Sequence, residues 1–256
     1  MKKYNYEDLE KRILDNIYVD KGDSSVLIAL CNENVNIYPL DFNGEGPTIV
    51  NNIENAYLHF FNIIMELPNF DFENFRRNMN RNFLIGVSME QVNSDAGITI
   101  FNDNKNLFGI FGDYNLVDRG VIYHELFHFA SYPTNFRRGL NEGYTEILTH
   151  RYFNKSKLAY PDNVDYVLKL ENIIGQDIME NAYSKGDVSI LSELFDEENY
   201  LLFEKINDRL DLLLGSYYRV NSGKKLADED RRVMKAKADL DAYLSVLVKK
   251  DNYKKR

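Results

Sequence analysis

The chain has 256 residues, of which 44% are hydrophobic and 28% charged, a composition typical of a globular protein with a full core. Acidic residues outnumber basic ones by 40 to 31, which gives a net charge of −9 and argues against nucleic acid and anionic membrane surfaces as partners. Cys31 is the only cysteine, so the sequence excludes an internal disulfide and a zinc cluster of several cysteines.

The N-terminal part of the chain mixes helical and strand patterns. Apolar residues at helical spacing predict helices over residues 5–18, 49–66 and 71–80. Short apolar or alternating runs predict strands over residues 26–30, 35–38, 83–87, 98–101 and 107–111. No stretch has the pattern of a signal peptide or a membrane span, so we expect a cytoplasmic protein with no membrane partner.

Residues 124–128 carry the most informative pattern, His-Glu-Leu-Phe-His. An HExxH sequence on a helix is typical of zinc hydrolases. Because residues four apart share a helix face, His124 and His128 would direct two imidazoles at one point and bind Zn²⁺ there. Glu125 lies beside that face and could take the proton of a metal-bound water. The competing interpretation is an amphipathic helix whose histidines pack or cap.

A second helix is expected shortly after this motif. Pro133 disfavours helix for the residue before it, so the first helix should end near Tyr132. A short basic turn over residues 137–139 then leads to a helix for which Asn141 is a plausible N-cap.

Two acidic residues, Glu142 and Glu146, lie four apart on one face of this second helix. Catalytic zinc sites use three protein ligands, and Glu142 can be the third. Glu146, one turn later, can accept the ring N–H of a ligand histidine and so orient the ring. The alternative for this pair is a solvated helix face.

These residues together resemble the gluzincin metallopeptidases, which are zincins with a glutamate as third ligand, such as the thermolysin-like peptidases and the aminopeptidases with an N-E-G motif. The resemblance covers residues 118–153 and depends on HELFH and on Asn-Glu-x-x-x-Glu at 141–146. It implies zinc bound by His124, His128 and Glu142, with Glu125 as general base and Glu146 in the supporting role. It also implies a strand before the metal helix that holds substrate in an extended form.

The link between the two motifs is shorter than in the large gluzincins. Thirteen residues separate His128 from Glu142, so the subfamily and the substrate stay open. Taking Glu146 as the ligand would bring the spacing nearer to that of the larger enzymes. We prefer Glu142 because that choice leaves Glu146 in the supporting role.

After residue 155 the pattern becomes helical, with apolar residues at helical spacing over residues 164–174, 197–214 and 225–249. We therefore expect an α+β, zincin-like fold. A small mixed or antiparallel sheet and the metal-site helices would form a catalytic domain, residues 1–155. A mainly helical C-terminal subdomain, residues 156–256, would follow.

The sequence thus predicts a zinc-dependent metallopeptidase acting on a peptide or protein substrate. By proximity in sequence only, the candidates for the oxyanion donor are Tyr144, His150, Tyr152 and Tyr160. One alternative is a catalytically inactive zincin-fold module for binding or regulation. Another is a helical interaction protein in which HExxH is accidental. Endo- or exopeptidase action and oligomeric state stay open.

Overall fold

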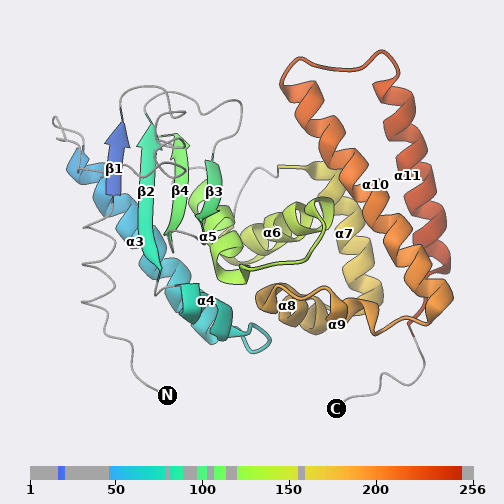
Figure 1. Cartoon of the computed structure of the whole chain (residues 1–256), viewed down its shortest axis with the longest axis horizontal. Coiled ribbons are helices and arrows are strands. Elements are labelled where there is room, and N and C mark those ends of the chain that lie inside the picture. Colours follow the sequence, from blue (N-terminus) through green and yellow to red (C-terminus); the bar gives the residue numbers. More distant parts are fainter. Residues whose placement is uncertain are drawn as a thin grey trace. The chain divides into compact units, whose positions relative to one another are not determined.

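The structure, a computed structural model, describes residues 17–20, 46–78, 81–88, 97–102, 107–113, 120–154 and 159–249. Helices predominate in this part of the chain (Figure 1). They are α3 Gly46–Glu66, α4 Phe72–Asn78, α5 Val121–Ser131, α6 Arg138–Phe153, α7 Pro161–Ile174, α8 Gln176–Lys185, α9 Ser189–Ser192, α10 Glu197–Asn221 and α11 Glu229–Val246. The strands in the described ranges are β1 Ile17–Asp20, β2 Asn82–Ser88, β3 Gly97–Asn102 and β4 Leu107–Asp113.

The expected α+β, zincin-like class is wrong, because the described part of the chain is mostly helical. In the described ranges no strand exceeds 7 residues, whereas α3 and α10 span 21 and 25. The physical reason is that apolar residues at helical spacing recur along most of the chain from α5 to α11, whereas the strand-like runs are short. The strands predicted over residues 26–30 and 35–38 lie outside the described residues. So does most of the helix predicted over residues 5–18, of which Ile17 and Tyr18 are described and belong to β1.

The chain divides into two compact units. The first comprises residues 1–67 and 75–130, and the second comprises residues 68–74 and 131–256. The main division between these units falls after Ala130. The predicted domains, residues 1–155 and 156–256, stay a prediction.

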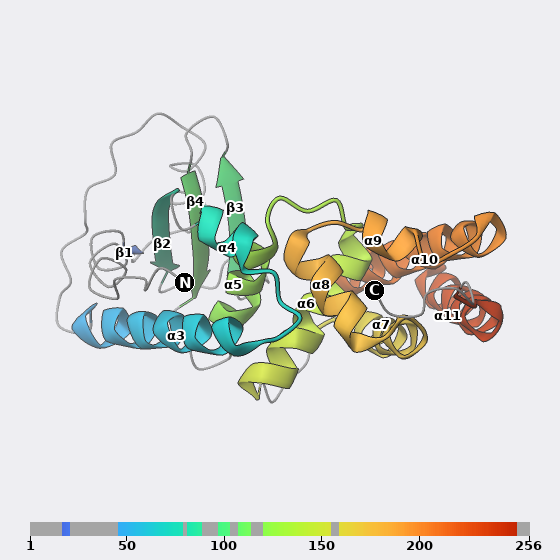
Figure 2. The same cartoon turned by 90° about the horizontal axis from the view of Figure 1, so that it is seen from below.

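The strands of the first unit pair in the order β1-β2-β4-β3 (Figure 1). Strand β2 is parallel to both β1 and β4, and β3 is antiparallel to β4. Helix α3 lies beside these strands in both views (Figures 1 and 2). The ring centroid of Phe60 on α3 lies 4.9 Å from that of Phe127 on α5. The ring centroid of Phe75 on α4 lies 5.3 Å from that of Phe129 on α5. All four rings are fully buried, and each contributes about 1.5–3 kcal/mol to stability by burial.

The second unit is helical in its described part. Helices α10 and α11 lie side by side and antiparallel (Figure 1), joined by the ion pairs Arg209–Asp239 at 2.8 Å and Arg219–Glu229 at 2.7 Å. Helix α10 also packs against α6 and α7. Across all described helices of the chain, none is both long and apolar enough to cross a membrane.

Candidate metal centre

Helix α5 carries the HELFH motif and has one apolar face. Ile122, Leu126 and Phe129 are fully buried, and their spacing of three and four residues places them on one stripe that packs into the core. At the end of the helix, Asn78 Nδ2 donates a hydrogen bond of 2.7 Å to the carbonyl oxygen of Phe129. This bond satisfies one of the carbonyl groups that a helix C-terminus leaves unpaired, and so fixes that end of α5.

His124 and His128 lie one turn apart on α5, away from this stripe. Their Nε2 atoms are 3.2 Å apart and their ring planes cross at 78°. Two imidazole nitrogens bound tetrahedrally to one zinc, each at about 2.0–2.1 Å, would lie about 3.3 Å apart. The same separation also suits a direct hydrogen bond between a protonated and an unprotonated ring nitrogen. The separation of the two Nε2 atoms therefore fits two ligands of one metal ion. A measurement of metal content distinguishes this interpretation from a direct hydrogen bond.

Glu125, the predicted general base, is only 5% exposed. Thr99 Oγ1 of β3 lies 2.5 Å from Glu125 Oε2 and 3.2 Å from the main-chain oxygen of the same residue, and donates to both. A hydroxyl has one hydrogen, which these two acceptors share. The contact holds the carboxylate in one orientation beside the histidine pair.

The connection between α5 and α6 is anchored to the turn after α8. Gly186 has φ +67°, and a Cβ there would lie 2.0 Å from the carbonyl oxygen of Pro133 and 2.4 Å from that of Ser131. Asn135 N–H donates to the oxygen of Gly186 at 2.9 Å, and Asn135 Oδ1 accepts from Val188 N–H at 2.6 Å. Only glycine fits this approach, so the path of the chain toward α6 is fixed.

The N-cap position of α6 is Arg137, four residues before the predicted cap Asn141, so the Asn141 prediction is wrong. The N–H of Asn141 donates to the oxygen of Arg137 at 2.9 Å, as it does inside a helix. The cap comes instead from Asp211 of α10, whose Oδ1 accepts from Gly139 N–H at 2.6 Å. Asp211 also pairs with Arg137 at 2.9 Å. A carboxylate distant in sequence therefore satisfies the first turn of α6 and complements its dipole.

Two glycines bring α6 close to its neighbours. A Cβ on Gly139 would lie 2.3 Å from the main-chain carbon of Leu210, and one on Gly143 would lie 2.9 Å from Val167 Cγ2. Asn163 of α7, which is buried, donates to the carbonyl oxygens of Gly139 at 3.1 Å and Leu210 at 2.9 Å. Close backbone packing and these bonds together fix both the position and the rotation of α6 in the second unit.

His124, His128 and Glu142, the three predicted ligands, form a group that could hold a metal ion. One ligand atom from each of His124, His128 and Glu142 lies within 4.8 Å of the other two. His124 is buried, and His128 and Glu142 are half-buried. Two imidazoles and one carboxylate form a donor set that suits Zn²⁺ with a fourth position open to water, and other divalent transition metals as well.

Glu146 lies one turn beyond Glu142 on α6 and is fully buried. Its Oε1 accepts a hydrogen bond of 2.6 Å from the N–H of Ala159. The predicted role of Glu146 toward a ligand histidine stays a prediction.

The last turn of α6 is held by a buried group of charges. Arg151 pairs with both carboxylate oxygens of Glu171 on α7, at 2.6 and 3.1 Å, and with Glu180 on α8 at 3.2 Å. Burial disfavours the charged form of Arg151, but the hydrogen bond and charge of Glu171 outweigh it and raise the pKa. Arg151 therefore stays charged and links the end of α6 to α7 and α8.

Two of the tyrosines considered as oxyanion donors are engaged within the second unit, Tyr144 in its core and Tyr152 in a half-buried position. Tyr144 is fully buried, and burial raises its pKa. Tyr152 donates to Glu180 Oε1 at 2.5 Å, and burial together with this bond raises its pKa to about 12. Both positions argue against a role with substrate. Tyr160 is half-buried, and its hydroxyl lies 2.9 Å from that of Tyr218.

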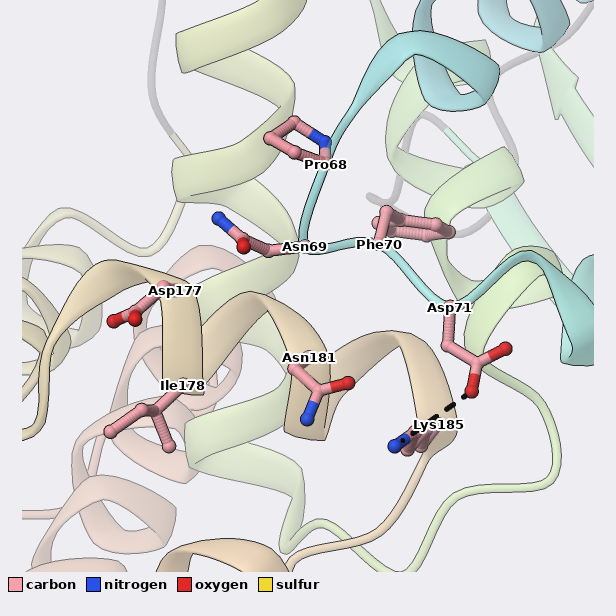
Figure 3. Close-up of a pocket in the computed structure, with 8 residues that line it drawn as sticks. All are labelled: Pro68, Asn69, Phe70, Asp71, Asp177, Ile178, Asn181 and Lys185. Atoms are coloured by element: carbon pink, nitrogen blue, oxygen red, sulfur yellow. Dashed lines mark ion pairs between the residues drawn. The ribbon is translucent and has the colours of Figure 1, made fainter. Parts of the chain in front are cut away.

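A pocket of about 420 Å³ lies between the loop after α3 and helix α8 (Figure 3). Its walls are formed by Pro68, Asn69, Phe70, Asp71, Asp177, Ile178, Asn181 and Lys185. Asp71 and Lys185 pair across one end at 3.9 Å (Figure 3). No predicted site residue lines this pocket, so it adds nothing to the candidate metal centre.

Comparisons of the chain with protein-family models, curated proteins and solved structures found no match. The resemblance to gluzincins therefore rests on the motif residues alone.

Sequence reasoning missed three residues that position the site: Thr99, Asp211 and Asn163. Thr99 is a single hydroxyl in a strand pattern, and Asp211 is one of several acids along α10. Their partners lie 26 residues away for Thr99 and 72 for Asp211, so no local spacing marks them.

Proposed function

We propose that this protein is a zinc-dependent peptidase. In the proposal, His124, His128 and Glu142 hold the zinc ion and Glu125 is the general base. The observation that carries it is the convergence of three ligand atoms within 4.8 Å, of which the two imidazole nitrogens have the separation of tetrahedral zinc ligands.

Bound zinc would polarise the scissile carbonyl and make an attacking water more acidic. Glu125 takes the proton of this water and delivers it to the leaving amine. The bond from Thr99 supports this role, because an oriented carboxylate transfers a proton more effectively than a mobile one. Glu146 supports a ligand histidine through its ring N–H.

The proposed setting is the cytoplasm. With Cys31 as the only cysteine, the 256-residue chain forms no internal disulfide and does not depend on an oxidising compartment. The substrate is a peptide or protein, and the net charge of −9 argues against nucleic acid as a partner.

The first experiment is elemental analysis of the purified protein, with Glu142→Ala and Glu146→Ala in parallel. We expect one zinc per chain in the wild type, loss of the zinc in Glu142→Ala and a much smaller loss in Glu146→Ala. The reason is that a direct ligand contributes more to zinc affinity than a residue that only orients a ligand histidine. The opposite ranking would make Glu146 the ligand. Absence of zinc after incubation with the metal would favour the direct His124–His128 hydrogen bond and end the proposal.

The second experiment screens a peptide library with the zinc-loaded protein. Glu125→Gln should keep zinc and lose hydrolysis, and His128→Ala should lose both, since only the latter removes a ligand. Undiminished turnover in Glu125→Gln would contradict the mechanism. Zinc binding without hydrolysis in the wild type would favour a binding or regulatory role.

A further inference from the structure

The first turn of α6 contains two consecutive arginines with opposite surroundings. Arg137 is fully engaged, with ion pairs to Asp208 at 2.6 Å, to Asp211 at 2.9 Å and to Glu204 at 3.8 Å. The side chain of Arg138 is exposed, and within the described residues no salt bridge links it to a carboxylate. Burial disfavours its charged form, but Tyr218 and the negative charge of Glu142 outweigh this effect and raise the pKa of Arg138. The packing of α6 therefore accounts for Arg137, whereas the carboxylate whose charge acts on Arg138 is that of Glu142, the proposed metal ligand.

The guanidinium of Arg138 is nevertheless held in place. Its Cζ lies 4.9 Å from the centroid of the Tyr218 ring, within the range of a cation–π contact. The Tyr218 hydroxyl is paired with that of Tyr160 at 2.9 Å, which fixes the ring. A guanidinium laid on an aromatic face keeps its N–H groups at the edge, where they can bind a planar anion through two bonds.

Arg138 also lies close to the proposed metal ligand. It precedes Glu142 by four residues on α6, a spacing that places the two side chains on one face with Cβ atoms about 5–6 Å apart. An exposed cation one helical turn from a proposed zinc ligand is well placed to meet a group of a bound substrate near the bond to be cut.

We propose that Arg138 binds a carboxylate of the substrate, in a subsite whose wall is formed by Tyr218 and Tyr160. This inference rests on the proposed peptidase function, because the fixed anions of a peptide are carboxylates. The carboxylate could be an acidic side chain next to the scissile bond or the C-terminus of the substrate. Either source uses the same two-bond recognition by arginine.

The experiment compares two pairs of peptides that share a cleaved sequence from the library screen. One pair has Glu or Gln next to the scissile bond and an amidated C-terminus. The other pair has a free or an amidated C-terminus and no acidic side chain. We expect the wild type to prefer the charged member of one pair by roughly tenfold in kcat/KM, the size of a charge-assisted hydrogen bond. The pair that shows the preference identifies the source of the carboxylate.

The variants are Arg138→Gln and Arg138→Lys, with Arg232→Gln as a control that removes one exposed charge from α11. Arg138→Gln should abolish the preference, Arg138→Lys should keep part of it because lysine lacks the fork geometry, and Arg232→Gln should keep it whole. An unchanged preference in Arg138→Gln would overturn the inference. Loss of zinc from Arg138→Gln would overturn it too, because Arg138 would then act on Glu142.

A binding measurement separates this inference from the peptidase proposal. Fluorescence anisotropy needs no turnover, and it uses peptides of the same two designs, labelled at the N-terminus and built on library sequences chosen without regard to cleavage. Carboxylate-dependent binding that Arg138→Gln abolishes would support the subsite even if the protein hydrolysed nothing. Equal binding of charged and amidated peptides to the wild type would overturn the subsite even if hydrolysis were found.

Discussion

Helices α5 and α6 carry the candidate ligands, but each is fixed within its own unit by different interactions. Around α5 the contacts are mainly aromatic, with the Phe127 ring against Phe60 and the Phe129 ring against Phe75. Helix α6 is fixed by polar groups and by close backbone packing, chiefly through Asp211 at its first turn.

This difference separates two kinds of constraint. Aromatic packing buries much apolar area and has a weak directional preference, so it contributes stability that is independent of pH. Polar contacts such as those of α6 contribute less free energy each, but they specify one register and depend on the charge of their groups. The two regions should therefore respond differently to substitution and to acid.

The largest effect should come from adding one methyl group to the closest packing. In Gly139→Ala the new Cβ would lie 2.3 Å from the main chain of Leu210, which cannot rotate away. We expect a loss of at least about 3 kcal/mol in the free energy of unfolding, measured in urea. Gly215→Ala on α10 is the control, since its Cβ meets only the flexible end of Arg219 at 3.3 Å. The control should be neutral or stabilised by up to about 1 kcal/mol. If Gly139→Ala and Gly215→Ala unfolded at the same urea concentration, α6 would not need the close approach of Gly139 to the main chain of Leu210.

A smaller effect is expected from the aromatic region. Phe127→Leu removes ring atoms from a fully buried position and should lower the free energy of unfolding by about 2 kcal/mol. Because the Phe127–Phe60 contact holds no titratable group, the difference from wild type should be the same at pH 7 and pH 4. A difference that changed with pH would show that α5 also depends on charged partners.

Next in size is the cap that α10 gives to α6. Asp211→Ala removes both the acceptor for Gly139 N–H and a partner of Arg137, and should lower the free energy of unfolding by about 1.5 kcal/mol. Asp208→Ala is the matched control, because Asp208 pairs with the same arginine but is 53% exposed and caps nothing. We expect the free energy of unfolding of Asp208→Ala to stay within about 0.5 kcal/mol of the wild-type value. If the control lost as much, the ion pairs rather than the cap would hold α6.

The same contrast explains what the sequence could and could not predict. The end of α5 was predicted to within one residue, because Pro133 is a local signal for where a helix ends. The convergence of His124 and His128 likewise follows from helix geometry. The start of α6 was missed, because its cap, Asp211, lies 72 residues away from Gly139. The predicted fold class was wrong because it was taken from the zincins that the motif residues resemble. A few motif residues do not determine how the rest of the chain packs.

The smallest prediction concerns acid and the pair that joins α10 to α11. Arg219 donates to both carboxylate oxygens of Glu229, at 2.7 and 2.8 Å, and these bonds lower the pKa of Glu229 from its usual 4.5 to about 2. A carboxylate with a depressed folded pKa stabilises the fold above its unfolded pKa, and this contribution is lost as the pH falls from about 4.5 toward 2. Thermal unfolding followed between pH 6 and pH 2 should therefore show falling stability across that window.

Glu229→Gln isolates this contribution from that of other acids, such as Asp239, whose pKa is also lowered, by Arg209. At pH 6 the variant should be less stable than wild type, because it has lost the charge that pairs with Arg219. The two stability curves should then converge as the pH falls through the window, since protonation of Glu229 removes the same charge from the wild type. Parallel curves would mean that the Arg219–Glu229 pair does not link protonation to folding. In that case ion pairs would not explain a difference in pH response between the helical unit and the aromatic surroundings of α5.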